Sequence, residues 1–594
     1  MCGIAGELRL DGTLPDLGRM DAMLARLERR GPDHVGSWSD GPLMFGHRRL
    51  SIIDLSARSH QPMVDAGLGL ALVFNGAIYN YRDLRHELAG RGYTFFTEGD
   101  SEVILKAYAE WGERCPERLD GMFAFAIREL GTGRLFLARD RMGIKPLYHA
   151  DGDGFFRFAS NTQALLAGGG IDTRPDPVAL HHQFTLHGVV PAPRTVMSGV
   201  RKLPPATSLT VGPDGERRER TYWRLRDRPR LEFGSEAEAV EATHEALRSA
   251  VARRRTVADV PVGVLLSGGL DSSLLVGLLH EAGEEDLRTF SIGFEDVGEE
   301  AGSEFEYSDA VAERFGTRHR RIHIPNEEVL PRLPEAIDAM SEPMFGQDAV
   351  AFYLLAERVS REVKVVLSGQ GADEVFGGYF WYPQIAGDTE GTAADRLARY
   401  YFDREHDEYL TMVAEGLGGP DHTRAWVERE LAETGEDDPV AAVLALDATR
   451  LVVDDPVKRV DNMTMAWGLE ARVPFLDHRL VETAAELPAE LRLRGDGGKY
   501  PLKAMARGLV PDSVIDRPKG YFPMPALKYV RGGFLEYMRD TLNSAAAYRR
   551  GVFRRDYIDM LLDAPESHHT RIQGSKLWHA ALFEAWFQRH VDDA

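Results

Sequence analysis

A cysteine at the second position gives this chain a nucleophile that can carry its own base. Once Met1 is removed, the freed α-amino group of Cys2 has a pKa of about 7.7–8.0 and is partly unprotonated at neutral pH. It belongs to the same residue as the thiol and can accept the thiol proton, as in amino-terminal nucleophiles. The sequence therefore predicts acyl-transfer chemistry at Cys2.

A second group of residues suited to chemistry is Ser267-Gly268-Gly269-Leu270-Asp271-Ser272-Ser273. Small residues let backbone N–H groups approach phosphate oxygens, and a helix that starts directly after them adds a favourable dipole. The apolar residues 260–266 precede this turn, so we expect a strand, a glycine turn and a helix in that order. This pattern predicts a nucleotide site.

Two different fold classes are expected to position these groups. Short apolar stretches such as 70–74 and 122–127 end at Asn or before Gly, which is typical of strands in stacked sheets. Further on, a capping signature at residues 235–238 and buried-type strands near 260–266 and 363–367 indicate a parallel α/β unit. We expect an α+β domain of stacked antiparallel sheets with flanking helices over 2–211, a linker over 212–234, and an α/β domain with a parallel sheet and many helices over 235–594.

Composition limits the possible partners and compartment. The chain has 594 residues and a net charge of −22, which argues against nucleic acid or an anionic membrane surface as the main partner. Cys2 and Cys115 are its only cysteines, and no leader pattern or membrane-length apolar run is present, so we expect a reducing, cytoplasmic location. The pairs His181-His182 and His568-His569 have no other metal-binding residues beside them in the sequence and are expected to be packing or surface residues.

Several motifs occur in order in the first half of the chain. They are Cys2-Gly3-Ile4, Arg30-Gly31-Pro32-Asp33, His47-Arg48-Arg49-Leu50, Asn75-Gly76-Ala77-Ile78-Tyr79-Asn80 and Gly99-Asp100-Ser101-Glu102. The set resembles the class II glutamine amidotransferase domain of the asparagine synthetase family, which has an Ntn-hydrolase-type fold. This resemblance implies that Cys2 attacks the side-chain amide of glutamine and forms a thioester with release of ammonia.

The same resemblance implies the other catalytic and binding roles in the first half. The Asn75 side chain and the Gly76 backbone N–H would form the oxyanion hole, in which one donor is typically worth about 3 kcal/mol. Arg49 would bind the α-carboxylate of glutamine, and Asp100 would bind its α-ammonium group. Ala77 stands where the family usually has Glu, so one polar contact to glutamine is missing. The implied glutamine-binding residues are Arg49, Ile53, Asn75, Gly76, Ala77 and Asp100.

The glycine turn resembles the pyrophosphate loop of ATP pyrophosphatases. The family resemblance implies that Asp271 and Asp373 hold Mg²⁺, which suits a hard, oxygen-seeking cation. It also implies that Lys503 is catalytic and that Gln370 and Lys499 serve acceptor activation. The implied ATP-binding residues are Leu265, Ser267, Gly268, Gly269, Asp271, Ser272, Ile292, Ser368 and Gly369. Residues 458–465 and 470–477 resemble the acceptor-side segment of the family.

The reaction implied by the resemblance has two stages. A carboxylate attacks the α-phosphorus of MgATP, giving an acyl-adenylate and pyrophosphate, and ammonia from glutamine then displaces AMP to give an amide. The family further implies an internal ammonia tunnel and pairing of two copies as a homodimer. A β-lactam-synthetase-like chain with an unused first domain is disfavoured because Cys2, Arg49 and Asp100 are present together.

Two members of the family differ in the carboxylate that they amidate, and the sequence has features that bear on this choice. Gln370 replaces a Glu that asparagine synthetases use, and Val350 and Phe352 stand in a stretch that is usually richer in Ser and Thr. Residues 517–525 and 574–578 resemble the N-acetylglutaminylglutamine amidotransferases, which amidate a modified dipeptide to make a compatible solute. This acceptor is favoured, L-aspartate is the alternative, and antibiotic or cell-wall precursors remain as further alternatives.

Overall fold

Two antiparallel sheets form the amino-terminal part of the protein. The computed structural model describes residues 2–296, 301–495, 497–517 and 530–592. Within these ranges the two sheets have six strands each, in the orders β10-β8-β9-β1-β3-β2 and β12-β11-β7-β6-β5-β4. Their strands are β1 (Cys2–Arg9), β2 (His34–Asp40), β3 (Leu43–Arg49), β4 (Met63–Asp65), β5 (Leu70–Ile78), β6 (Gly121–Glu129), β7 (Leu135–Arg139), β8 (Tyr148–Gly152), β9 (Phe155–Ala159), β10 (Val200–Lys202), β11 (Thr207–Val211) and β12 (Arg217–Thr221).

The alternation of side chains along the strands explains why these sheets stack. In β5, Ala71 and Val73 belong to a buried cluster shared with β1 and β3 of the other sheet. Leu72 and Phe74, the alternate residues, belong to the cluster that packs against helices. Because successive side chains of a strand point to opposite faces, one strand serves both layers of the core. The expected stacked-sheet fold of this half is confirmed.

A parallel sheet of five strands forms the centre of the carboxy-terminal part. Within the described ranges its order is β15-β14-β13-β16-β17, and all neighbours are parallel. The strands are β13 (Val262–Leu265), β14 (Arg288–Phe294), β15 (Arg318–Ile324), β16 (Val365–Leu367) and β17 (Glu470–Arg472). Since β13 has β14 on one side and β16 on the other, the sheet has a switch point there, where ligands bind beyond the carboxyl ends of the strands.

Helices make up most of the remaining described structure, and α6 begins where the capping signature predicts. The Oγ of Ser235 accepts a hydrogen bond from the Glu238 N–H at 3.2 Å. The α-helices are α1 (Leu17–Ala25), α2 (Tyr81–Gly90), α3 (Asp100–Trp111), α4 (Thr162–Ala167), α5 (Pro177–Thr185), α6 (Glu236–Thr256), α7 (Leu270–Glu281), α8 (Phe305–Phe315), α9 (Asn326–Ala339), α10 (Asp348–Val359), α11 (Ala372–Phe376), α12 (Trp381–Gly387), α13 (Ala393–Tyr401), α14 (His406–Met412), α15 (His422–Thr434), α16 (Pro439–Leu446), α17 (Lys458–Met465), α18 (His478–Ala485), α19 (Ala489–Arg492), α20 (Tyr500–Ala506), α21 (Asp512–Ile515), α23 (Gly532–Leu542), α24 (Ala545–Arg550), α25 (Arg555–Asp563) and α26 (Lys576–Phe587). In the described part of the chain, none of them combines the length and apolar character needed to cross a membrane.

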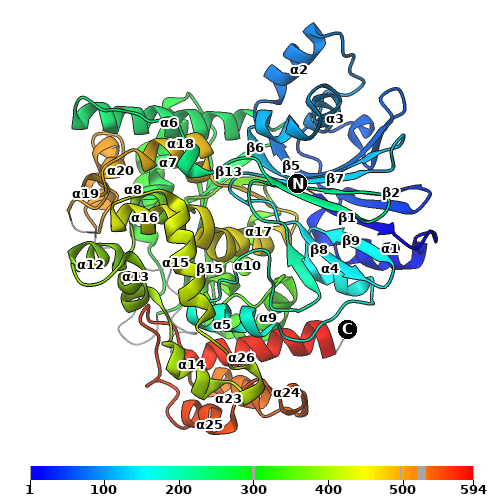
Figure 1. Cartoon of the computed structure of the whole chain (residues 1–594). Helices are drawn as coiled ribbons and strands as arrows, with labels where there is room; N and C mark the ends of the chain where they lie inside the picture. Colours follow the sequence, from blue (N-terminus) through cyan, green and yellow to red (C-terminus); the bar gives the residue numbers. More distant parts are fainter. Residues whose placement is uncertain (1, 297–300, 496, 518–529, 593–594) are drawn as a thin grey trace.

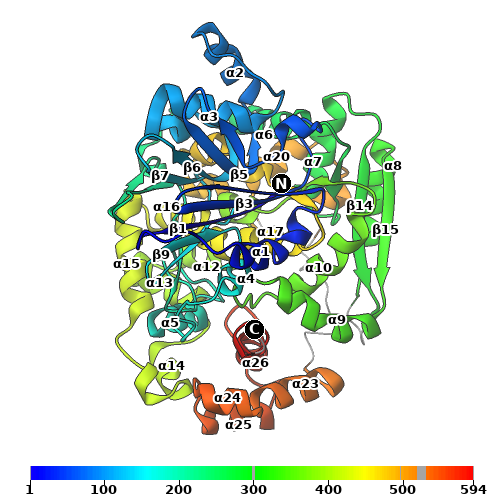
Figure 2. The ribbon, with the colours of Figure 1, turned by 90° about the vertical axis from the view of Figure 1, so that its right-hand side faces the viewer.

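The last helix, α26, is buried along almost its whole length. The indole N–H of Trp578 donates to the Phe345 carbonyl at 3.0 Å, and that of Trp586 donates to the Met340 carbonyl at 2.7 Å. Figure 1 shows this helix, in red, running beneath α5 and α9, and Figure 2 shows it nearly end-on. The tail therefore belongs to the core of the carboxy-terminal part.

The segment 212–234, which we expect to be a linker, contains a strand of the second sheet. β12 pairs with β11 through five residues, from Arg217 to Thr221. The indole N–H of Trp223 then donates to Glu482 of α18 at 2.7 Å. The beginning of this segment thus belongs to the sheet of the first part, and its Trp223 contacts a helix of the second part.

Candidate active sites

Strand pairing brings the residues of the first site together around Cys2. Cys2 starts β1 and lies opposite Arg49 of β3 in the antiparallel register. The Cys2 backbone N–H donates to the side-chain oxygen of Asn75 in β5 at 3.0 Å. A small pocket opens here, and its lining includes Cys2, Arg49, Ile53, Gly76 and Asp100.

The two residues implied as oxyanion donors are Asn75, whose side chain contacts Cys2, and Gly76, which lines the pocket. The Nδ2 of Asn75 is buried and has no hydrogen-bond partner among the described residues, while its Oδ1 is held by Cys2. A Cβ on Gly76 would lie 2.2 Å from the Met122 carbonyl oxygen, so only glycine fits at this position. The chain therefore presents an uncommitted amide donor beside the thiol.

Electrostatics in the pocket suit a thiol that needs a base. Burial raises the pKa of the Cys2 thiol, and the nearby Arg49 charge acts in the opposite direction. The guanidinium of Arg49 donates to the backbone carbonyls of Ser56 at 2.8 Å and of Asp54. These bonds fix a buried positive charge in the pocket, where it can receive a carboxylate.

Asp100 supplies the negative charge of the same pocket. It is the first residue of α3, and its Oδ2 accepts a hydrogen bond from the Ile78 N–H at 3.0 Å. Burial raises the pKa of Asp100 to about 6. An ammonium group placed against it would favour the ionised carboxylate.

The structure adds pocket residues that the motifs do not indicate. Ser59, Gln61 and Glu470 also line the pocket, whereas Ala77 is fully buried and is not among the lining residues. Glu470 comes from β17 of the carboxy-terminal part. Burial raises the pKa of Glu470, but the charge of the amino terminus, followed by those of Arg472 and Lys145, brings it down to about 2. Glu470 belongs to the segment 470–477 that resembles the acceptor-side segment of the family, and the structure places it in the lining of this pocket and not of the larger cavity described below.

A buried cluster of charges joins the two parts of the chain. Asp461 of α17 accepts from Arg30 at 2.9 Å through one oxygen and from Lys145 at 3.0 Å through the other. All three side chains are at most 6% exposed. Arg30 and Lys145 belong to the first part of the chain and Asp461 to the second, so the cluster lies at the interface between the two parts. Asp461 does not line the nucleotide cavity.

We expect Asp461→Asn to destabilise the protein strongly. Removing one partner of a buried ion pair leaves uncompensated charge and typically costs about 3–5 kcal/mol. Urea unfolding of the variant should show this loss. The control is Asp286→Asn, because Asp286 and its ion-pair partner Arg318 are 58% and 69% exposed, and its loss should stay within about 1 kcal/mol. Equal losses in the two variants would contradict the role given to the cluster.

The second site is a cavity of about 1,090 Å³ at the carboxyl ends of β13 and β16. Gly268, implied for ATP binding, is not among the lining residues, although its neighbours Ser267 and Gly269 are; it has φ +78°, and a Cβ on it would lie 2.7 Å from the Ser308 backbone nitrogen. Nearly all residues implied for ATP and acceptor activation line this one cavity. They are Leu265, Ser267, Gly269, Asp271, Ser272, Ile292, Ser368, Gly369, Gln370, Asp373, Lys499 and Lys503.

Lys499 connects the two carboxylates that are implied as metal ligands. Its Nζ lies 2.7 Å from Asp271 Oδ2 and 2.9 Å from Asp373 Oδ1. Burial lowers the pKa of Lys499, but the two carboxylates outweigh burial and hold it above its ordinary value. Lys499 also has φ +58°, a left-handed conformation that costs energy in a residue with a Cβ and is typical of functional positions.

The acceptor-side residues divide between the cavity and the core. Phe352 lines the cavity together with Leu355, whereas Val350 is fully buried and is not among its lining residues. Glu304, which no motif includes, and Arg517, the first residue of the motif 517–525, pair at 3.0 Å on the cavity wall. Residues 518–525 of the second acceptor motif lie outside the described residues.

The fold and the two sites define a glutamine-hydrolysing, ATP-dependent amidotransferase. A family model described as "Glutamine amidotransferase domain" matches residues 1–223, and one described as "Asparagine synthase" matches residues 242–588. The chain belongs to the asparagine synthase family.

Three similar proteins are named as asparagine synthetases. Asparagine synthetase [glutamine-hydrolyzing] 3 of Bacillus subtilis is 31% identical over all of this chain and 99% of its own length. A putative asparagine synthetase of Mycobacterium tuberculosis is 35% identical over 95% of this chain and 93% of its own. Asparagine synthetase B of Escherichia coli is 28% identical over 88% and 82%.

Proposed function

We propose that this amidotransferase uses glutamine and ATP to amidate the C-terminal carboxylate of N-acetylglutaminylglutamine. The observation that carries the proposal is the cavity wall beside the phosphate loop, where Gln370, Phe352 and Leu355 stand. An acetylated dipeptide has no free ammonium group and offers amide and methylene surface, which suits an uncharged amide and two apolar side chains. Free aspartate would instead need fixed charges for both of its ends.

Ammonia is produced at the first site. The α-amino group of Cys2, free once Met1 is removed, takes the thiol proton, and the sulfur attacks the glutamine side-chain amide. Asn75 and the Gly76 N–H stabilise the oxyanion, while Arg49 and Asp100 hold the two ends of the amino acid. The carbon–nitrogen bond breaks, ammonia leaves with the proton, and water hydrolyses the thioester to glutamate.

The acceptor is activated at the second site. One acceptor oxygen attacks the α-phosphorus of ATP and pyrophosphate leaves, so that AMP becomes the group that ammonia later displaces. Asp271 and Asp373 fit Mg²⁺, because both already face one cation and offer the oxygen ligands that this ion prefers. Bound there, Mg²⁺ supplies charge neutralisation for the phosphates. Lys499 and Lys503 add positive charge to the same wall.

Strand pairing makes the internal route for ammonia short. Glu470 lines the glutamine pocket and begins β17. β17 pairs with β16, and β16 is followed by Ser368 and Gly369, which line the nucleotide cavity. The Ser368 N–H donates a hydrogen bond to the carbonyl of Arg472, the last residue of β17, at 2.9 Å. One lining residue of each site, Glu470 and Ser368, is thus joined to the other through the three-residue strand β17 and one hydrogen bond, which supports a tunnel along this path.

A pyrophosphate-release screen tests the acceptor. With ATP and ammonium chloride supplied, N-acetylglutaminylglutamine should stimulate release, and L-aspartate should not. Vigorous release with aspartate and none with the dipeptide would overturn the choice. Aspartate is the second candidate because the relatives described above are named asparagine synthetases.

Glutamine binding should depend on the ionisation of Asp100. Because its pKa is raised to about 6, the carboxylate that binds the α-ammonium group becomes protonated as the pH falls below that value. The KM for glutamine should therefore rise about tenfold for each pH unit below the pKa, while staying flat above it. Glutaminase assays across this range measure the effect. An Asp100→Asn variant should have a high KM without that slope, and a flat wild-type profile would contradict the assignment.

A further inference from the structure

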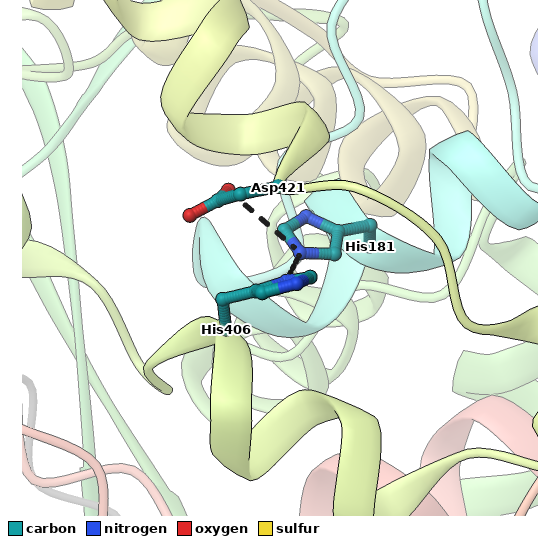
Figure 3. A group of neighbouring side chains, drawn as sticks. All are labelled: His181, His406 and Asp421. Carbon is teal, nitrogen blue, oxygen red and sulfur yellow. Dashed lines mark hydrogen bonds and ion pairs between the residues drawn. The ribbon is translucent and has the colours of Figure 1, made fainter.

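Three donor atoms from distant segments converge where the first part of the chain meets helices of the second. His181 of α5, His406 of α14 and Asp421, the N-cap residue of α15, each place one such atom within 4.8 Å of the others. The Nε2 of His181 lies 2.9 Å from His406 Nδ1 and 3.8 Å from Asp421 Oδ1. Figure 3 marks the contacts of His181 with His406 and with Asp421 as dashed lines. The sequence-based expectation that His181 has no metal-ligand company is wrong, because its neighbours lie more than 200 residues away in the chain.

We propose that His181, His406 and Asp421 form a Zn²⁺ site that links the two parts of the chain. Two imidazole nitrogens and one carboxylate oxygen are ligands that Zn²⁺ accepts, and three protein ligands leave a fourth position for water. His181 lies in the segment matched by the glutamine amidotransferase model, and the other two residues lie in the segment matched by the asparagine synthase model.

The hydrogen bonds of His181 allow this ligation without moving its ring. With Nε2 protonated, the ring donates to His406 while its Nδ1 accepts from the Thr423 N–H at 3.3 Å. With Nδ1 protonated, it donates to the Thr423 hydroxyl at 2.8 Å, and the Nε2 lone pair faces the group. The second tautomer is the usual state of a ligating histidine, whose other nitrogen is bonded to an oxygen nearby. A shift of one proton therefore prepares the ligand.

Donor spacing and access also fit the ion. Zinc–ligand distances of about 2.0–2.2 Å in a tetrahedral arrangement place donor atoms roughly 3.3–3.5 Å apart. The observed 2.9 and 3.8 Å lie on either side of this spacing, and the donor atoms of His406 and Asp421 lie within 4.8 Å of each other. His181 is 1% exposed, but His406 and Asp421 are half-buried and open the site to solvent.

The carboxylate of the group is fixed by a backbone hydrogen bond of its own helix. Asp421 accepts the Arg424 N–H at 2.8 Å through the same oxygen, a bond that holds the carboxylate in place at the start of α15.

Metal content of purified protein tests the site. The full chain, in a Cys2→Ala background so that the reactive thiol cannot bind the metal, is stripped with a chelator, incubated with Zn²⁺, desalted and analysed by mass spectrometry. We expect about one Zn²⁺ per chain. His406→Gln and Asp421→Asn should lose it; both positions are half-buried, and asparagine caps a helix as well as aspartate does. The control is His323→Gln, an exposed histidine on β15, which should retain the ion.

A thermal-unfolding measurement gives an independent readout. Zn²⁺ should raise the Tm of the parent and of His323→Gln in a concentration-dependent way, because the ion binds only the folded site. It should leave the Tm of His406→Gln unchanged. The proposal is overturned if the parent protein does not retain about one Zn²⁺ per chain. It is also overturned if the His406→Gln and Asp421→Asn variants bind as much Zn²⁺ as the parent.

Discussion

Replacing Cys2 by alanine should abolish amide formation from glutamine and leave amide formation from ammonia intact. The thiol is the nucleophile of the first site only, where it faces Asn75, Arg49 and Asp100. Removing a nucleophile of this kind typically lowers turnover by at least about 10³-fold. Ammonia supplied from solution bypasses the thioester, so ATP-dependent turnover with ammonium chloride should stay within about twofold of wild type.

The assay compares amide, glutamate and AMP formed with each nitrogen source. Cys115→Ala is the matched control, because Cys115 is the other cysteine and is fully buried away from the pocket lining. That variant should retain glutamine-dependent activity. If glutamine still supports amide formation by Cys2→Ala, the first site does not use this thiol. If ammonia also fails, the two sites are not separable in the way that their geometry implies.

The ordered motifs predict that Cys2, Arg49, Ile53, Gly76 and Asp100 share one pocket, and the structure places all five in its lining. Cys2 and Arg49 face each other through antiparallel pairing, and Asn75 ends the apolar run of β5. Glu470 could not be predicted in this way. It reaches the pocket from a strand of three residues, and its position depends on how the two parts pack. His181 and His406 meet for the same reason.

The last strand of the first part, β12, could not be predicted from the pattern of hydrophobic residues. Residues 70–74 and 122–127 alternate between two buried faces, so their strands are evident in the sequence. β12, by contrast, reads Arg-Arg-Glu-Arg-Thr and is largely exposed. It lies at the edge of the sheet and is held by backbone pairing with β11. An edge strand needs no apolar side chains and is often charged, so the sequence looks like a linker.

Replacing Lys499 by glutamine should stop activation of the acceptor while leaving glutamine hydrolysis in place. Lys499 is the buried cation of the nucleotide cavity that contacts both Asp271 and Asp373, at 2.7 and 2.9 Å. Without it, the two carboxylates repel each other, and the phosphates lose a fixed positive charge where negative charge develops during adenylation. Loss of one such electrostatic contact typically lowers the rate about 10²–10³-fold.

Acceptor-dependent release of pyrophosphate from ATP measures this step, and glutamate formation from glutamine in the same preparation reports on folding of the first site. The matched control is Lys364→Gln, since Lys364 pairs with Asp33 at 2.7 Å but is 39% exposed and lies outside the cavity lining. Its activation rate should remain within about twofold of wild type, as expected for an exposed ion pair. A Lys499→Gln variant that releases pyrophosphate normally would show that the cavity activates its substrate without this lysine. Parallel loss of glutaminase activity would instead show that Lys499 maintains the fold, because the glutamine pocket contains none of its contacts.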